Sequence, residues 1–203
     1  MKYVSLGHAC QVAHQLKRLG LSEETLFYDW LVTHHGRLMD SLDFSFKNRL
    51  FSEGYTLPQK SNYLIENSTG LSFYPHDFRG LPEKDTKLID SQIDDVRSKY
   101  MRRAERTLEI LNSSQQVCVV RHFFSEPLDN IIGQQKEIID KLGHLYPTTE
   151  FQYLWASELE TANLNSPHGP IHHLPKANVW QGDDTAWGKA ASNETLSYSL
   201  NVD

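Results

Sequence analysis

Long apolar runs and abundant cysteines are both missing from this sequence. No stretch approaches the roughly 18 consecutive apolar residues that a membrane span requires. The N-terminal segment, residues 1–8, has too few apolar residues for a signal peptide. Two cysteines are too few for a disulfide framework. Together these features predict a cytoplasmic protein without a membrane segment, whose thiols are reduced.

A surplus of basic residues is also absent. The 20 Lys and Arg face 26 Asp and Glu, which gives a formal net charge of −6, whereas a nucleic-acid-binding module carries a clear basic excess. The Cys-x-x-Cys, His-Glu-x-x-His and EF-hand spacings of metal sites do not occur, and neither does a phosphate-binding loop. We therefore expect no nucleic-acid partner, no metal and no cofactor. A small molecule, a peptide or a glycan is the expected substrate.

Apolar residues alternate along the chain between short strand-like runs and stretches with helical spacing. The pattern predicts a single α/β domain over residues 1–203, with a mixed, partly parallel sheet and flanking helices. Residues 165–203 could form a C-terminal cap, and residues 45–62 have no clean period. The predicted strands are 2–6, 63–66, 71–74, 117–124 and 150–155, and the predicted helices are 9–19, 36–42, 88–111 and 128–143.

Cys10 is placed unusually for a cysteine that only packs. The apolar stripe of the first predicted helix includes Val12 and Leu16, and Cys10 points away from it, in the first helical turn. Amides and the helix dipole stabilise a thiolate at that end, which predicts a lowered pKa. The same amides, with Gly7 allowing close backbone approach, could hold an oxyanion. The alternative is a small residue tolerated at a helix start, and Cys118, inside an apolar strand, is expected to fill the core.

A nucleophilic thiol needs an imidazole within hydrogen-bond reach and a third group that orients this imidazole. His76 is the best placed histidine, because it follows a predicted strand and can project into a cleft. We expect its ring to approach the Cys10 sulfur directly or through one water. Asp77 follows it, but neighbours on an extended chain point in opposite directions, so Asp77 orients His76 only if the chain turns there. Asp29, within an apolar run, is the other orienting candidate, or a structural salt bridge or cap.

Other charged and aromatic residues allow two interpretations each. Arg103 lies at the edge of the apolar face of the helix predicted over 88–111, so it either pairs with a carboxylate such as Asp29 or faces an anionic ligand. Trp180 and Trp187 flank two aspartates, and this segment is either an aromatic platform for a sugar or a packed C-terminal cap.

Four segments together resemble a known family in their order and spacing. They are Ser5-Leu-Gly-His-Ala-Cys10, Tyr28-Asp-Trp-Leu-Val32, Phe73-Tyr-Pro-His-Asp-Phe78 and Tyr100-Met-Arg-Arg-Ala-Glu-Arg106. The family is a bacterial one of unknown function, described as putative papain-like cysteine peptidases, and the resemblance spans roughly residues 3–124. It implies that Cys10 is the nucleophile and His76 its base. We expect substrate contacts from Gly7, His8, Trp30 and Arg103.

Three functions remain open at this point. The leading one is a thiol-dependent hydrolase or acyl transferase of papain-like type, acting on an amide or ester. The second is an esterase-like α/β enzyme that modifies a glycan, whose base would come from the C-terminal third, as His172 or His173. The third is a non-catalytic binding protein that keeps the cleft.

Overall fold

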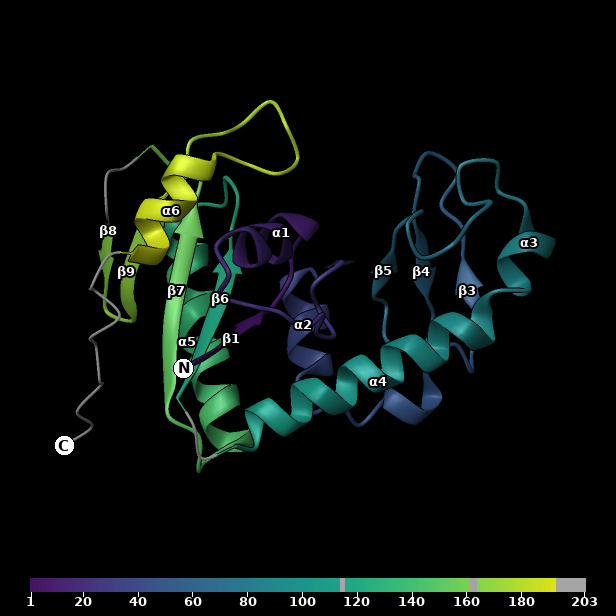
Figure 1. Cartoon of the computed structure of the whole chain (residues 1–203), viewed down its shortest axis with the longest axis horizontal. Coiled ribbons are helices and arrows are strands. Elements are labelled where there is room, and N and C mark those ends of the chain that lie inside the picture. The colour runs from purple at the N-terminus through teal and green to yellow at the C-terminus, as the bar shows by residue number, and fades with distance from the viewer. Residues whose placement is uncertain (114–115, 161–163, 193–203) are drawn as a thin grey trace.

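A computed structural model describes residues 1–113, 116–160 and 164–192, and its main layer is a five-stranded sheet (Figure 1). The strand order is β1-β6-β7-β9-β8; the first four are parallel to one another and β8 is antiparallel to β9. This confirms a mixed, mostly parallel sheet in an α/β fold. The strands are β1 (Lys2–Ser5), β6 (Val117–His122), β7 (Phe151–Ser157), β8 (Leu164–Ser166) and β9 (Gly169–His173).

Helices cover both faces of this sheet, because side chains of the buried strand β6 alternate between two apolar clusters. Val117 and Val119 pack in the cluster that includes α5 (Leu128–Leu145) and α4 (Ile93–Leu111). Cys118 and Val120 pack with α1 (Cys10–Arg18) and α6 (Asp184–Ser192). Cys118 is therefore a core residue, as predicted.

A second sheet of short antiparallel strands has the order β2-β5-β4-β3, of which β5, β4 and β3 are labelled in Figure 1. The predicted hairpin is confirmed, with β4 (Leu64–Glu66) paired to β5 (Ser72–Phe73). The other two strands are β2 (Leu31–Val32) and β3 (Tyr55–Thr56). Residues 45–62 were expected to be irregular, but they supply β3 and a 3₁₀ turn, η1 (Lys47–Arg49). Strands of two residues are too short to show a periodic pattern.

The single helix predicted over 88–111 is wrong, because α3 (Thr86–Asp90) ends before α4 begins. Gln92 lies at the break, and its side chain bonds to the backbone of Arg79 in both directions, accepting from N at 3.0 Å and donating to O at 2.9 Å. The same amide also donates to Leu88 O at 2.6 Å, and local side-chain bonds to the backbone compete with helix continuation. The apolar face was predicted correctly, since Val96, Tyr100 and Ala104 are buried.

The segment expected as a C-terminal cap adds β9 to the main sheet and places α6 against its face; its residues 193–203 lie outside the described part of the chain. The predicted helix at 36–42 is present as α2 (His35–Ser41). Among the described residues, no helix combines the length and the apolar character needed to cross a membrane.

Candidate active site

The turn between β1 and α1 positions Cys10. Gly7 and His8 both adopt positive φ angles, 71° and 79°, which is uncommon for a residue such as histidine. A Cβ on Gly7 would lie 2.6 Å from Thr33 Oγ1 and 2.9 Å from the backbone oxygen of Tyr28. Close packing against the chain at β2 therefore requires glycine, and the turn places Cys10 at the first position of α1.

A buried arginine fixes this turn to the end of β2. Arg121, in β6, is fully buried and donates from Nη1 to Leu6 O at 2.8 Å and from Nη2 to Thr33 O at 2.7 Å. Thr33 Oγ1 also donates to Leu6 O and accepts from His8 N, both at 2.7 Å. Charge-assisted bonds of this kind hold the backbone rigidly, so the segment that carries Cys10 is well fixed.

Two amides of the turn just before α1 are already engaged. Gly7 N donates to Ser5 Oγ at 3.0 Å, and His8 N donates to Thr33 Oγ1. The expected substrate contact through Gly7 is therefore replaced by a structural role. At the N-cap of α1, Ala9 offers no side-chain hydrogen bond to the first turn, so the amides of that turn are the available donors.

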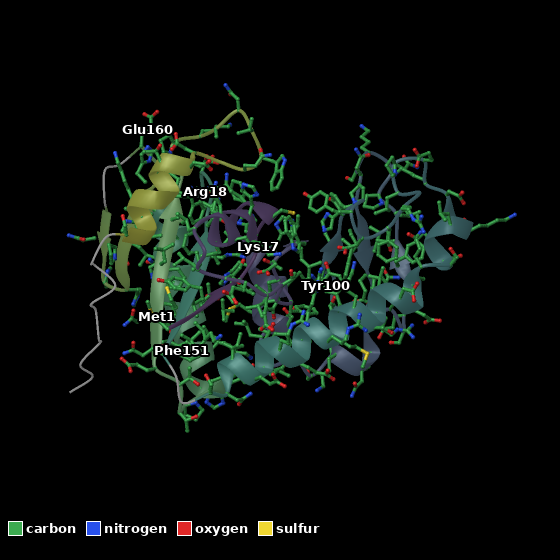
Figure 2. The ribbon with its side chains drawn as sticks, in the orientation of Figure 1. Met1, Lys17, Arg18, Tyr100, Phe151 and Glu160 are labelled. Atoms are coloured by element: carbon green, nitrogen blue, oxygen red, sulfur yellow. The ribbon has the colours of Figure 1, made fainter. Side chains whose placement is uncertain are left out.

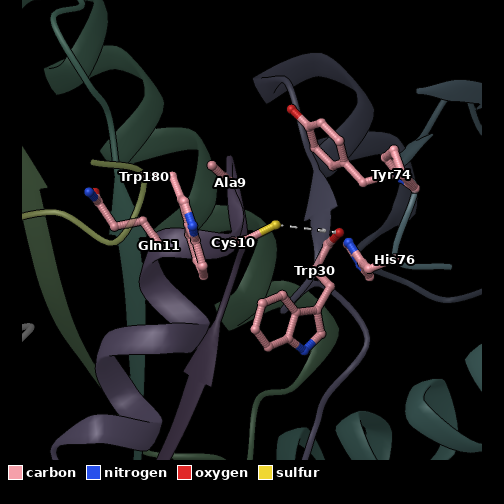
Figure 3. Close-up of a pocket in the computed structure, with 8 residues that line it drawn as sticks. Ala9, Cys10, Gln11, Trp30, Tyr74, His76 and Trp180 are labelled. Atoms are coloured by element: carbon pink, nitrogen blue, oxygen red, sulfur yellow. Dashed lines mark hydrogen bonds between the residues drawn. The ribbon is translucent and has the colours of Figure 1, made fainter. Parts of the chain in front are cut away.

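Cys10 and His76 line the same cleft, which lies between α1 and the end of β5 and has a volume of about 500 Å³ (Figure 3). Figure 3 shows Trp180 on one side of Cys10, and Tyr74 and His76 on the other. The remaining lining residues are Ala9, Gln11, Trp30 and Pro75. The Cys10 thiol donates to Trp30 O at an S–O distance of 3.9 Å. The residues predicted as nucleophile and base thus line one cleft with Trp30, but the thiol bonds to Trp30 O and, among the described residues, no hydrogen bond joins it to His76.

His76 is held by Asp77, its neighbour in the chain, because the chain turns here. Asp77 N donates to Tyr74 O at 3.0 Å, and His76 Nε2 lies 3.2 Å from Asp77 Oδ2. The Asp77 side chain is 1% exposed, whereas that of His76 is 40% exposed. A carboxylate that binds Nε2 fixes the proton there and leaves the lone pair on Nδ1. Nδ1 is the nitrogen that can accept a proton.

Two residues of α4 complete the surroundings of Asp77. Lys99 Nζ lies 2.5 Å from Oδ1, and the Tyr100 hydroxyl donates to Oδ2 at 2.7 Å; Tyr100 is labelled on α4 in Figure 2. Burial, the largest influence, raises the pKa of Asp77, but the bonds from His76, Lys99 and Tyr100 outweigh it and hold the pKa below its usual value. Asp77 is therefore a stable anion that orients the imidazole.

The expectation of a lowered pKa for the Cys10 thiol is wrong for this conformation. The pKa is raised to about 11, mainly by burial; the bond to its own backbone amide opposes this rise, and the negative charge of Asp77 adds to it. Desolvation thus outweighs the helix terminus. At neutral pH the thiol keeps its proton, so a base has to remove that proton as the sulfur attacks.

Asp29 and Arg103 lie outside this cleft. Asp29 is buried and its Oδ2 accepts from Leu26 N at 2.7 Å, so it stabilises the turn over residues 26–29, and among the described residues no helix starts or ends there for it to cap. The guanidinium of Arg103 lies 4.6 Å from the centre of the Tyr100 ring, and its charge acts on Asp29. Among the described residues, no salt bridge joins the two, so the expected ion pair is absent.

The other histidines considered as substrate contact or base, His8, His172 and His173, lie outside this cleft. His8 Nδ1 is 3.2 Å from His122 O, and burial lowers the pKa of His8 to about 3. His8 packs against Phe124 and does not line the cleft, so the substrate contact predicted for it is not supported. His172 and His173 line a separate cleft with α6.

Asp29→Asn is expected to remove a pH-dependent loss of stability. Burial raises the pKa of Asp29 from 3.8 to about 6, although the Leu26 amide and nearby cations oppose the shift. A carboxyl whose folded pKa is raised favours the folded state below pH 4, and this contribution is lost as the pH rises through 6. The wild type should lose about 3 kcal/mol of unfolding free energy relative to the variant between pH 4 and 7.

Urea unfolding at half-unit pH steps measures this difference, and the asparagine oxygen can still accept from Leu26 N. Asp43→Asn is the matched control, because Asp43 is exposed. Parallel pH profiles for wild type and Asp29→Asn would show that the buried carboxyl does not titrate in this range.

Several residues of the cleft were not singled out from the sequence. Tyr74 and Pro75 directly precede His76 and line the cleft. Lys99, on α4, forms a salt bridge with Asp77. Tyr74 and Pro75 could have been found because they are next to His76, the predicted base, at the end of a predicted strand. Lys99 gave no such signal, because it is one of many charged residues on a predicted amphipathic helix.

Comparisons with known proteins agree with the resemblance seen in the four segments. The uncharacterized protein R408 of Acanthamoeba polyphaga mimivirus is 25% identical over 230 residues, which cover 95% of this chain and 97% of that protein. No solved structure matches the chain significantly. Residues 1–143, which include both Cys10 and His76, match the family described as putative papain-like cysteine peptidase (DUF1796). The chain therefore belongs to this family.

Proposed function

We propose that the protein is a thiol-dependent hydrolase or acyl transferase, in which Cys10 attacks the carbonyl carbon of an amide or ester. The observation that carries the proposal is the shared cleft of Cys10 and His76. Cys10 supplies a thiol at the N-terminus of α1. His76 supplies an imidazole whose Nε2 is bound by the buried carboxylate of Asp77. These are the residue types that nucleophilic catalysis uses, and their shared cleft supports the proposal.

In the proposed reaction, rotation of the Cys10 side chain away from Trp30 O brings the thiol to His76 Nδ1. Contacts of this kind are often long before substrate binds. Nδ1 takes the thiol proton while the sulfur forms a bond to the carbonyl carbon, and the amides of the first turn of α1 bind the resulting oxyanion. His76 then gives the proton to the leaving amine or alcohol.

The second half of the reaction resolves the thioester. Water, or another nucleophile in a transferase, gives a proton to His76 and attacks the thioester carbonyl, and the Cys10 sulfur leaves and regains the proton. Asp77 acts as the positioning residue, because its charge stabilises the imidazolium that exists between the two proton transfers. A peptide or a small acyl compound is the proposed substrate.

The esterase-like alternative receives less support. It requires His172 or His173 near the nucleophile, but both lie in a cleft with Asp183 and Lys189, and His173 Nδ1 is 2.6 Å from Leu159 O. The non-catalytic alternative differs from the proposal only in the absence of turnover, so an experiment separates them.

Trapping of a covalent adduct tests the proposal. The protein in a Cys118→Ala background is incubated with acyl-ester, peptidyl and glutamine-amide probes, and intact mass with peptide mapping locates the adduct. We expect an acyl adduct on Cys10 with at least one probe class, and none in Cys10→Ala. His76→Ala should slow its formation at pH 7 by about 100-fold or more, because general-base assistance is lost.

Two outcomes would contradict the proposal. If every probe leaves Cys10 unmodified while free cysteine reacts, the cleft serves binding only. If His76→Ala acylates at the wild-type rate and His172→Ala or His173→Ala does not, the esterase-like arrangement replaces the proposed one. Thermal unfolding of each variant checks that it is folded.

A further inference from the structure

Aromatic rings form much of the wall around Cys10. Trp30, Tyr74 and Trp180 line the cleft together with Pro75 and Ala9. Trp180 is 56% exposed and is part of this apolar cleft wall rather than a scattered surface residue. Trp187, which was considered with it as a sugar platform, is buried against the sheet and takes no part in the cleft.

The segment that carries Trp180 is fixed above the start of α1. Gln15 Nε2 donates to Gln181 O at 2.6 Å and to Asp184 Oδ1 at 2.8 Å, and Gly182 N donates to Val179 O at 3.1 Å. The Trp180 ring also lies edge-on to His14, with 5.2 Å between the ring centres. These contacts hold the indole next to Cys10 (Figure 3). A ring in a fixed place loses little entropy when it binds a ligand.

Trp180 lies outside residues 1–143, the part of the chain that matches the family. The nucleophile and the base thus come from the family segment, whereas one wall of their cleft comes from the C-terminal third. A specificity element on a separate segment can change without any change in the catalytic residues.

The chemistry of the lining defines what the cleft can bind. None of the lining residues is Asp, Glu, Lys or Arg, and the only titratable groups besides the thiol are His76 and the Tyr74 hydroxyl. Gln11, the one amide, has its Oε1 buried and away from solvent. A glycan subsite needs several open polar groups for sugar hydroxyls, and a charged ligand group would be desolvated here without a partner.

We infer that the cleft binds an uncharged apolar group of aromatic size, attached to the carbonyl that Cys10 attacks, and that Trp180 determines this specificity. The inference rests on the proposed function for the reacting carbonyl. A cleft of about 500 Å³ has room for such a group beside the reacting bond, since ligand pockets range from about 300 to 1,000 Å³.

Alkylation rates of Cys10 test the inference without turnover. In the Cys118→Ala background, the rate constants for N-benzyl-iodoacetamide and iodoacetamide are measured at pH 8.5, and each is divided by the rate with free cysteine. We expect the benzyl reagent to be favoured by about tenfold, because apolar burial adds to its binding. A 4-carboxybenzyl analogue should lose the preference.

Trp180→Ala should reduce the benzyl preference to below about threefold, and Trp180→Phe should retain most of it. Val179→Ala is the matched control, because Val179 is adjacent, 57% exposed and not part of the lining; its preference should equal that of the wild type. Both Trp180 variants should unfold at the wild-type temperature, since an exposed ring contributes little to stability.

Equal rates for the two reagents, or an unchanged preference in Trp180→Ala, would overturn the inference while leaving the proposed function open to the trapping test. If Cys10 reacts with neither reagent, binding of N-benzylacetamide to Cys10→Ala is measured by tryptophan fluorescence, with N-acetylglucosamine as the alternative ligand. Binding of the sugar alone would also overturn the inference. Failure of the proposed function gives a different result: Cys10 forms no acyl adduct in the trapping test, although it still prefers the benzyl reagent in the alkylation test.

Discussion

Cys10→Ala is expected to abolish turnover of any ester or amide that acylates the protein, and Cys10→Ser to lower kcat/KM by about 10⁴-fold or more. The hydroxyl of serine is far harder to deprotonate than a thiol, and His76 is the base that must remove the proton. Burial already raises the pKa of the Cys10 thiol to about 11, and it would disfavour a serine alkoxide at the same position as well.

Steady-state kinetics of the purified variants measure this loss, and Cys118→Ala is the control. Cys118 is the other thiol of the chain and is buried in β6, so its removal should leave kcat/KM within about twofold and reduce stability by about 1 kcal/mol. Turnover by Cys10→Ala above a few per cent of wild type would show that another residue is the nucleophile.

The part of the site that the sequence predicted depends on local patterns. The position of Cys10 at a helix start, away from the apolar stripe, follows from helical periodicity alone. The hairpin that ends before His76 was likewise visible, because its two apolar runs flank a polar turn. Both features come from residues close in sequence, where spacing determines which side chains share a face.

The part that the sequence did not predict depends on distant contacts. Arg121 follows the apolar first half of its strand, and only the fold shows that it is fully buried and binds the backbone of residues 6 and 33. The pairing of Asp77 with Lys99 and Tyr100 spans more than twenty residues. The raised pKa of the Cys10 thiol is set by burial under segments from across the chain, so helix position alone predicted the wrong direction.

The role of Trp180 in the cleft also could not be predicted from the sequence. In the sequence, Trp180 and Trp187 flank a pair of aspartates, and both were considered equally as part of an aromatic platform for a sugar. Only the fold separates them, because Trp187 faces the sheet within α6 whereas Trp180 precedes the helix and lines the cleft. A residue in an irregular segment has no periodicity from which its direction can be inferred.

Gly7→Ala is expected to destabilise the protein by about 4 kcal/mol. An alanine at a φ of 71° costs about 1–2 kcal/mol by itself. The added Cβ would lie 2.6 Å from Thr33 Oγ1, the atom that binds Leu6 O, His8 N and Arg121. Displacing Thr33 would strain or break these bonds, and a steric conflict with a packed group adds about 1–3 kcal/mol.

Gly20→Ala provides the matched control for this prediction, since Gly20 has a φ of 68° and no atom within 4 Å of its added Cβ. Urea unfolding of the two variants therefore separates backbone conformation from crowding: Gly20→Ala should lose about 1–2 kcal/mol and Gly7→Ala clearly more. Hydrogen exchange at the His8 amide should also accelerate in Gly7→Ala alone, because that amide donates to Thr33 Oγ1. Equal losses in the two variants, with unchanged exchange at His8, would mean that the turn before Cys10 accommodates a side chain and that packing against Thr33 does not position the nucleophile.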